Sequence, residues 1–487
     1  MLQRLVLAVL VLVWLAELAC ATPGRPQVAT YLFYWYNSDR GIGFQNAQGK
    51  HLLTHHPWNP VGYSWEKVDW YYRELKDMAS AGIDVVLPVY WGYPGGEETW
   101  SFVGLPPLVE AERRLLAEGV KAPKIGLFES GAGLVHNQSN YQADFTTEEG
   151  REWLYQTVKL FFERIPRDLW ATVEGRPLVV NYTNEHRIPH DETWPDYLRA
   201  RFEQEFGVQP YLVKDASWSG PADSAYCWGS ALYGPSDFGV VTLGPGFDSS
   251  AVSGPDAPKR EREGGAFYCR SWEWLLARPF ESRSKLVLLE TWNELFEGTD
   301  LCHSREYGRD YIRLTRRYAE AFHQGEVWPL AWLPFNASIS LGEENISAGL
   351  TQTDVPDGVT EPVLIADVSA RRTVATRLPG RYMLFEVDNF LPRGKGVTVE
   401  VKVTCLDDAP GELLLEYDSL DTSLPYTGRF KSAGLVKRKG KGGWMTANFK
   451  LVEPAFSNRL HGQDIRLVDV SKNLTVKAVQ LKVLRWR

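Results

Sequence analysis

Between residues 28 and 322 the chain alternates between short apolar runs and segments with apolar residues at helical spacing. The apolar runs are rich in β-branched and aromatic side chains, which is typical of buried strands. Parallel strands need a long crossover connection, and the helical segments supply it. Eight strands separated mostly by helices over roughly 300 residues predict a (β/α)8 barrel, irregular before its seventh strand, where the interval is too short for a full helix. The predicted strands are residues 28–36, 83–90, 124–129, 177–182, 210–213, 225–228, 240–243 and 286–289.

The helical periodicity disappears after Gln324, and a different pattern follows. From residue 359 onward, short alternating runs are separated by turn signals, which predicts an antiparallel β-sandwich of jelly-roll type. Such a domain could bind carbohydrate or serve as a structural cap, and the sequence leaves both open. The predicted organisation is a barrel domain at 22–326, a linker at 327–358 and a β-sandwich at 359–487.

The first 21 residues have the pattern of a signal peptide. Arg4 precedes an apolar run at 5–16, and Ala19-Cys20-Ala21 supplies a cleavage site before Thr22. The run is too short to span a bilayer as a helix, and no other stretch reaches that length. We therefore expect a secreted or periplasmic protein; lipidation of Cys20 is the alternative. Of the remaining cysteines, Cys269 and Cys302 flank the eighth predicted strand and are the first choice for a disulfide.

Composition narrows the class of partner. The net charge of −8 argues against a nucleic-acid partner, which would favour a basic face. No CxxC motif or Cys/His cluster indicates a metal site, and no glycine-rich loop has the context of a phosphate site, so we expect no metal and no cofactor. Nineteen Trp residues are many for 487, and flat rings stack on sugars, although an aromatic-rich core is the plainer explanation.

Residues 285–300 read KLVLLETWNELFEGTD, a buried strand that turns acidic within one residue. Active sites of barrels lie at the C-terminal ends of the strands. Glu294 and Glu297 are three residues apart, so both carboxylates could enter one pocket, as cleavage of a glycosidic bond requires. Glu290 lies too low in the strand to react and is expected to support them. A charged loop that caps a helix is the alternative interpretation.

Polar and aromatic residues collect at the other predicted strand ends and in the long loop after the first strand. In a barrel these ends share one rim, so we expect their side chains to bind substrate. For each, a place in the core or in a structural ion pair is the alternative. The candidates are Trp35, Tyr36, His55, His56, Trp58, Tyr90, Trp91, Glu129, Asn181, Tyr182, Trp228, Asp248, Trp292 and Asn293.

The motif WNELFEGT at 292–299 resembles the signature of the endo-α-mannosidase family of glycoside hydrolases, family 99. The stretches AGID at 81–84 and EYG at 306–308 resemble further blocks of that family, so the resemblance extends over residues 28–325. It implies that Glu294 acts as a base on the 2-hydroxyl of the sugar, through an epoxide-like intermediate, and that Glu297 acts as acid and base, with net retention. Leu295 and Phe296 differ from the usual family residues, and a direct nucleophilic role for one Glu is the alternative.

The predicted function is thus a secreted hydrolase of oligo- or polysaccharides. A glycan-binding barrel without activity is the rival; it would keep the aromatic residues but would not need both acids. An ester hydrolase would need a Ser nucleophile, and the chain contains no G-x-S-x-G motif.

Overall fold

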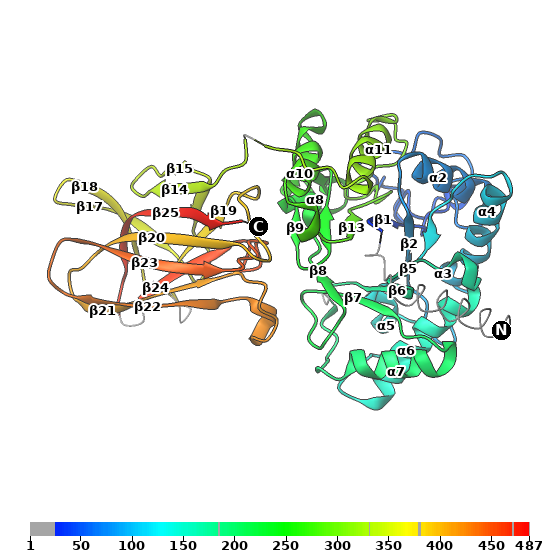
Figure 1. Ribbon diagram of the computed structural model, residues 1–487, viewed down its shortest axis with the longest axis horizontal. Coiled ribbons are helices and arrows are strands. Elements are labelled where there is room, and N and C mark those ends of the chain that lie inside the picture. The colour runs from blue at the N-terminus through cyan, green and yellow to red at the C-terminus, as the bar shows by residue number, and fades with distance from the viewer. Residues whose placement is uncertain (1–24, 184–185, 331, 378–380, 470–471, 487) are drawn as a thin grey trace, which may run out of the picture.

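The computed structural model describes residues 25–183, 186–330, 332–377, 381–469 and 472–486. The predicted signal peptide at 1–21 lies outside these residues. Figure 1 shows two bodies, one of helices around a central sheet, coloured blue to green, and one of β-strands, coloured yellow to red. We call them the barrel domain and the β-domain.

The barrel domain is built on a nearly closed sheet of parallel strands. Along the sheet, β8, β7, β6, β4, β2, β1, β13 and β10 are neighbours in that order. The two ends meet where Ala225 bridges Gly239 in parallel, and the N–H of Val240 donates to the Ala225 carbonyl at 3.0 Å. The strands are β1 (Gln27–Leu32), β2 (Val85–Tyr90), β4 (Leu127–Glu129), β6 (Arg176–Asn181), β7 (Tyr211–Asp215), β8 (Ser224–Tyr226), β10 (Val241–Leu243) and β13 (Leu286–Leu289), with short strands β3 (Lys124–Ile125), β5 (Thr172–Val173) and β9 (Ser236–Asp237) at the edges.

Helices surround this sheet and follow most of its strands (Figure 1). No helix lies between β7 and β8, where all connecting residues are described. There the Lys214 ammonium donates to the carbonyls of Trp218 and Gly220, at 2.8 and 2.6 Å, and holds a short connection of turns. The predicted irregularity before β10 is present too, since that interval holds only the four-residue α8 and β9, which is antiparallel to β10. The connection between β7 and β8 is a second irregularity, which was not predicted. The helices are α2 (Val68–Ser80), α3 (Trp100–Val103), α4 (Leu105–Ala117), α5 (Gly131–Val135), α6 (Glu148–Arg164), α7 (Trp194–Phe206), α8 (Ser230–Tyr233), α9 (Ser250–Ser253), α10 (Ala266–Leu276) and α11 (Asp310–His323).

Strand β1 ends at Leu32, earlier than the predicted end at residue 36. The strand ends there because the side chain of Asn293 forms the hydrogen bonds that a neighbouring strand would otherwise form. The N–H of Phe33 donates to Asn293 Oδ1 at 2.8 Å, and the Phe33 carbonyl accepts from Asn293 Nδ2 at 2.8 Å. Trp35 and Tyr36 consequently lie in the loop that follows β1.

The β-domain consists of two antiparallel sheets that share one core. Their inward side chains, such as Phe385, Val401, Leu415 and Leu481, form a single buried cluster. In the first sheet β15, β14, β25, β18 and β17 are neighbours, and β20 joins β25 to β23; in the second the order is β16, β19, β24, β21, β22. The strands are β14 (Asn336–Ser340), β15 (Ile346–Ala348), β16 (Leu350–Thr353), β17 (Thr360–Ile365), β18 (Val368–Thr373), β19 (Tyr382–Val387), β20 (Thr398–Leu406), β21 (Pro410–Tyr417), β22 (Lys431–Lys439), β23 (Trp444–Val452), β24 (Ile465–Asp469) and β25 (Thr475–Arg485).

The segment predicted as a linker, 327–358, contains three of these strands. β14 pairs with β25 and β16 pairs with β19, so both belong to the β-domain. All three residues of β15 are exposed, so this strand has no apolar face to reveal it in the sequence.

The predicted disulfide is also absent, because Cys269 and Cys302 are free thiols in this structure.

The two domains contact each other around β9. The guanidinium of Arg393, 1% exposed, donates to the Pro235 carbonyl. The Arg459 guanidinium lies 4.7 Å from the centre of the Phe238 ring. The β-domain therefore docks on the barrel domain through buried or ring-stacked arginines.

Because the core of the β-domain is drawn only from residues 337–483, a fragment spanning residues 336–487 should fold by itself. We expect one cooperative thermal transition and a circular dichroism spectrum of β type. A spectrum of a disordered chain would show that this domain needs the barrel domain.

Candidate active site

The loop after β13 is folded back on itself by short-range hydrogen bonds. The N–H of Thr291 donates to the Thr299 carbonyl at 3.0 Å, and the two hydroxyls lie 2.9 Å apart. The N–H of Glu294 donates to the Thr291 hydroxyl at 2.9 Å. These bonds give residues 291–299 a fixed shape at the C-terminal end of β13, and we call these residues the acidic loop.

Glu294 is buried in this loop, 3% exposed. Its Oε1 accepts from the N–H of Phe296 at 3.1 Å, and its Oε2 has no hydrogen-bond partner among the described residues. Burial, followed by the charge of Glu297, raises the pKa of Glu294 well above its usual range. Glu297 is half-buried, so the pair combines an enclosed acid with one nearer to solvent.

Aromatic rings from the loop after β1 pack against the acidic loop. The Trp35 ring stacks on that of Phe296, with centroids 5.8 Å apart, and meets that of Trp91 edge-on at 5.6 Å. All three rings are half-buried, and we call them the aromatic wall. Tyr36 is fully buried; its hydroxyl accepts from the N–H of Leu295 at 3.1 Å. Tyr36 therefore positions the acidic loop.

Asn293 and Trp292, both predicted to contact substrate, are instead structural. Asn293 is fully buried; besides its two bonds to Phe33, its Nδ2 donates to the Tyr63 hydroxyl at 2.9 Å. Trp292 is also fully buried, and its indole N–H donates to Glu74 of α2 at 2.7 Å. The first two residues of the motif thus anchor the loop to its surroundings.

His55 anchors the other end of the acidic loop. Its Nδ1 lies 2.6 Å from Asp300 Oδ1, and Arg262 Nη2 lies 3.1 Å from the same oxygen. Arg262 also donates to the carbonyls of Gly298 and Asp300, both at 2.8 Å. Burial opposes ionisation of Asp300, but Arg262 and His55 outweigh it and lower the pKa of this carboxyl. The charged network fixes residues 298–300, and no motif in the sequence marks Arg262 as part of it.

His56 and Trp58 lie on the surface beside this network. His56 Nδ1 is 2.9 Å from the Glu306 carboxylate. Trp58 is 57% exposed, and its ring stacks on His303 at 4.8 Å. Their predicted contact with substrate stays a prediction.

Asp248 reaches the site through its backbone. Its N–H donates to the Glu297 carbonyl at 2.8 Å, while its carboxylate pairs with Lys259 at 3.0 Å. Asp248 belongs to β11 (Phe247–Asp248), which pairs with β12 (Lys259–Arg260). This hairpin supports Glu297 through the backbone of Asp248. The carboxylate of Asp248 has a structural role, in its ion pair with Lys259.

Tyr90, Glu129 and Asn181 lie behind the wall of the barrel. They are lateral partners on β2, β4 and β6, so their side chains project from the same face. The Tyr90 ring packs on Phe102 of α3 and Phe161 of α6, at 5.5 and 5.2 Å, which shows that this face is turned toward the helices. Glu129 accepts from Asn181 Nδ2 at 2.7 Å, and burial raises its pKa to about 8. The expectation that these three residues line the rim is corrected, because strand alternation turns them outward.

The neighbouring row of side chains points into the barrel. Tyr31 of β1 contacts the rings of Phe128 and Trp228, with centroids 4.4 and 5.1 Å apart. Tyr182 meets Phe128 at 5.2 Å. Tyr182 and Trp228, both half-buried, therefore form an aromatic floor with Tyr31 and Phe128.

Two further acids face this floor. The Glu290 carboxylate accepts from the N–H groups of Gly229 and Ala231 at 3.1 Å, and burial raises its pKa to about 8. Asp215 accepts from the Trp228 N–H at 3.1 Å, and burial raises its pKa as well. These bonds hold Glu290 to the start of α8, and its support of Glu294 and Glu297 stays a prediction. Asp215 was not predicted, because Lys214 separates it from the apolar run at 211–213.

A family model described as a domain of unknown function, DUF5010, matches residues 45–330, more than half of the chain. The chain belongs to this family. The match includes β13 and the whole acidic loop, so the candidate site lies inside the family domain. No curated protein matches the chain.

Solved structures with a similar course of the chain include a GH99 endo-α-mannosidase from Bacteroides thetaiotaomicron. It is 12% identical, the match covers 61% of this chain and 98% of that one, and the TM-score is 0.48. A glycoside hydrolase-like protein is 15% identical, over 62% and 95% of the two chains, with a TM-score of 0.44. A family 6 carbohydrate-binding module from a Zobellia galactanivorans laminarinase matches 30% of this chain and 98% of its own, at 10% identity and a TM-score of 0.19.

Within the described ranges, no group of three or more His, Cys, Asp or Glu side chains could hold a metal ion. None of the helices in these ranges is both long and apolar enough to cross a membrane.

Replacing Asn293 with Ala tests its structural role in this DUF5010 chain. The change removes three hydrogen bonds and leaves the buried backbone groups of Phe33 unpaired, which costs about 2–5 kcal/mol. We expect a large fall in the midpoint of thermal unfolding. Trp58→Ala, at an exposed ring beside the same loops, is the control and should change it little. An unchanged midpoint for Asn293→Ala would show that Asn293 does not fix the loop.

Proposed function

We propose that this protein is a glycoside hydrolase that cleaves an oligo- or polysaccharide, with Glu294 and Glu297 as its catalytic acids. The observation that carries the proposal is the enclosed Glu294 carboxylate, with one oxygen unpartnered, beside the more exposed Glu297 and the aromatic wall. Cleavage of a glycosidic bond needs one acid on each side of the reacting centre. Burying a carboxylate oxygen without a hydrogen-bond partner costs free energy unless a ligand supplies that partner.

The electrostatics of the pair suit one acid and one base. Burial and then the charge of Glu297 raise the pKa of Glu294. When the proton is on Glu297, Glu294 is an anion in a site that disfavours its charge and is therefore a strong base. Under this proposal Glu294 removes the proton of the sugar 2-hydroxyl, and that oxygen displaces the leaving group, which takes the proton from Glu297. Water, deprotonated by Glu297, then opens the three-membered ring at the anomeric carbon, while Glu294 returns its proton to the 2-oxygen. The two displacements give net retention.

The remaining predicted features belong to the same proposal. The ring of parallel strands, with helices in most connections, supports a (β/α)8 barrel as the catalytic domain. The aromatic wall and the floor of Tyr182 and Trp228 offer half-buried rings for stacking on sugars. The proposed chemistry uses only groups of the chain itself and is metal-independent.

A glycan-binding protein without activity is the second candidate, favoured by the abundance of aromatic rings. It would bind saccharides through the aromatic wall without using a proton on Glu297. Measurement of new reducing ends separates the two, because only the hydrolase produces them.

Export is part of the proposal and rests on the sequence alone. We expect the secreted or periplasmic protein to begin at Thr22, because Ala19-Cys20-Ala21 follows the apolar run. N-terminal sequencing of the exported protein checks this. A blocked N-terminus on a lipidated Cys20 would replace cleavage after Ala21 with anchoring.

Glu294→Gln and Glu297→Gln should each lower turnover by at least about 100-fold, because a positioned acid or base contributes roughly 10²–10⁴-fold. Gln keeps the shape of each side chain, so thermal unfolding should change little. An activated aryl glycoside needs little protonation of its leaving group. Such a substrate should restore part of the rate of Glu297→Gln and none of that of Glu294→Gln.

Glu320→Gln provides the matched control. Glu320 lies half-exposed on α11 and pairs with Arg316, away from the acidic loop, so its loss should leave turnover unchanged. Near-normal hydrolysis by both site variants, on a saccharide that the unchanged protein cleaves, would place the catalytic acids elsewhere.

A further inference from the structure

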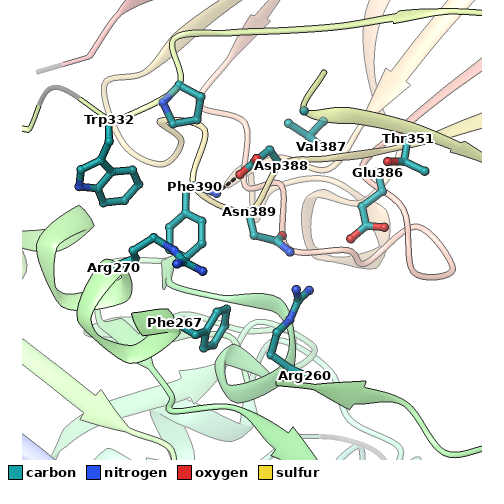
Figure 2. Close-up of a pocket in the computed structure, with 12 residues that line it drawn as sticks. Arg260, Phe267, Arg270, Trp332, Thr351, Glu386, Val387, Asp388, Asn389 and Phe390 are labelled. Carbon is teal, nitrogen blue, oxygen red and sulfur yellow. Dashed lines mark hydrogen bonds between the residues drawn. The ribbon is translucent and has the colours of Figure 1, made fainter. Parts of the chain in front are cut away.

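A cavity of about 620 Å³ lies between the barrel domain and the β-domain. Its volume falls within the roughly 300–1,000 Å³ of small-molecule sites. The barrel domain contributes residues from β12 and α10, and the β-domain contributes residues from β16, β19 and the loop after β19 (Figure 2). Nothing in the proposed catalytic chemistry uses this cavity.

Aromatic rings form one side of the cavity. Trp332 is 37% exposed and meets Phe390 edge-on, with centroids 5.6 Å apart. The Arg270 guanidinium lies 5.3 Å from the centre of the Phe390 ring. The Trp332 indole is held by a hydrogen bond from its N–H to Glu273 at 3.2 Å. A flat ring is therefore fixed in place while part of its surface stays open to a ligand.

Polar groups converge on the other side. Figure 2 shows the Asn389 amide, the Glu386 carboxylate and the Arg260 guanidinium facing one another across the cavity. Asn389 is 8% exposed, and its Oδ1 is buried without a hydrogen-bond partner among the described residues. Arg260 is fixed by a bond from its Nε to the Leu232 carbonyl at 2.8 Å, which leaves its terminal nitrogens directed at the cavity.

The charges of the lining limit the class of ligand. Arg260 and Arg270 are balanced by Glu386 and Asp388, so the cavity as a whole favours neither a strong anion nor a strong cation. An amide, a guanidinium and a carboxylate beside a flat ring can bond hydroxyl groups as donors and acceptors and stack on an apolar ring face. Neutral sugars present hydroxyls at the edge and C–H groups on the face.

We propose that this cavity is a second carbohydrate-binding site, which takes a neutral oligosaccharide with Trp332 as the stacking ring and Asn389 as the central hydrogen-bonding group. Binding there does not depend on hydrolysis. The cavity is nevertheless connected to the acidic loop through the β11–β12 hairpin. Arg260 pairs with Phe247 in that hairpin, and the next residue, Asp248, donates its N–H to the Glu297 carbonyl.

The test uses the full chain carrying Glu294→Gln, so that a bound saccharide is not consumed. Gluco-, manno- and xylo-oligosaccharides of about six sugars are titrated by calorimetry, with an oligogalacturonate as the anionic probe. We expect at least one neutral oligosaccharide to bind, and Trp332→Ala or Asn389→Ala to weaken that binding about tenfold or to remove one bound molecule per chain. Trp332→Phe keeps a flat ring and should retain most of the affinity.

Leu435→Ala, at a side chain 55% exposed on β22, is the control and should leave binding unchanged. Thermal unfolding of each variant confirms that it is folded; Trp332 is partly exposed, so its replacement should be tolerated even if that of Asn389 is not. The proposal is overturned if no neutral oligosaccharide binds, if those that bind do so equally well without Trp332, or if only oligogalacturonate depends on the cavity. If the protein with Glu294 intact binds through the cavity but releases no reducing ends, that result would contradict the hydrolase and leave this proposal standing.

Discussion

The candidate site depends on one side chain, the buried amide of Asn293. It bonds both backbone groups of Phe33 and so ends β1 where the sheet would otherwise continue. The chain then leaves the barrel as a loop that carries Trp35 to the acidic loop. Because the same amide belongs to the loop after β13, the first and last barrel strands are joined at the point where the proposed catalytic pair lies. This contact and the bond from the Leu295 N–H to the Tyr36 hydroxyl together fix Glu294 relative to the aromatic wall.

Burial of carboxylates divides the acids near the barrel into two kinds. Asp300 is buried beside Arg262 and His55, and these partners outweigh desolvation and keep it ionised. Glu294 has one backbone donor and a neighbouring acid, so burial raises its pKa. A buried carboxylate that is paired with cationic side chains stays ionised and holds a loop in place. A buried carboxylate without a cationic partner has a raised pKa and is available for proton transfer. The distinction lies in the partners of each acid, since both are almost fully buried.

Strand prediction succeeded where one face of a strand is apolar and buried. β19 shows this pattern, because most of its side chains are buried in the core of the β-domain. β22 shows no such pattern, because its residues are largely exposed at the edge of the sheet and no apolar periodicity marks it. The interval before β10 lacks a full helix, as predicted from its length. The connection between β7 and β8 also lacks one, and there the bonds of Lys214 hold a set of turns that no sequence signal marks.

The sequence by itself determined the classes of element, their order, and the position of the acid pair after a strand buried on both faces. It could not assign side chains at the strand ends to the interior or the exterior. Tyr90 and Trp91 are adjacent, yet Tyr90 packs on helices and Trp91 joins the aromatic wall. Only the tertiary structure decided this, because successive residues of a strand point in opposite directions and the register of the neighbouring strands sets which direction is inward. The cavity between the domains is likewise a product of docking, since its lining comes from segments that share no motif.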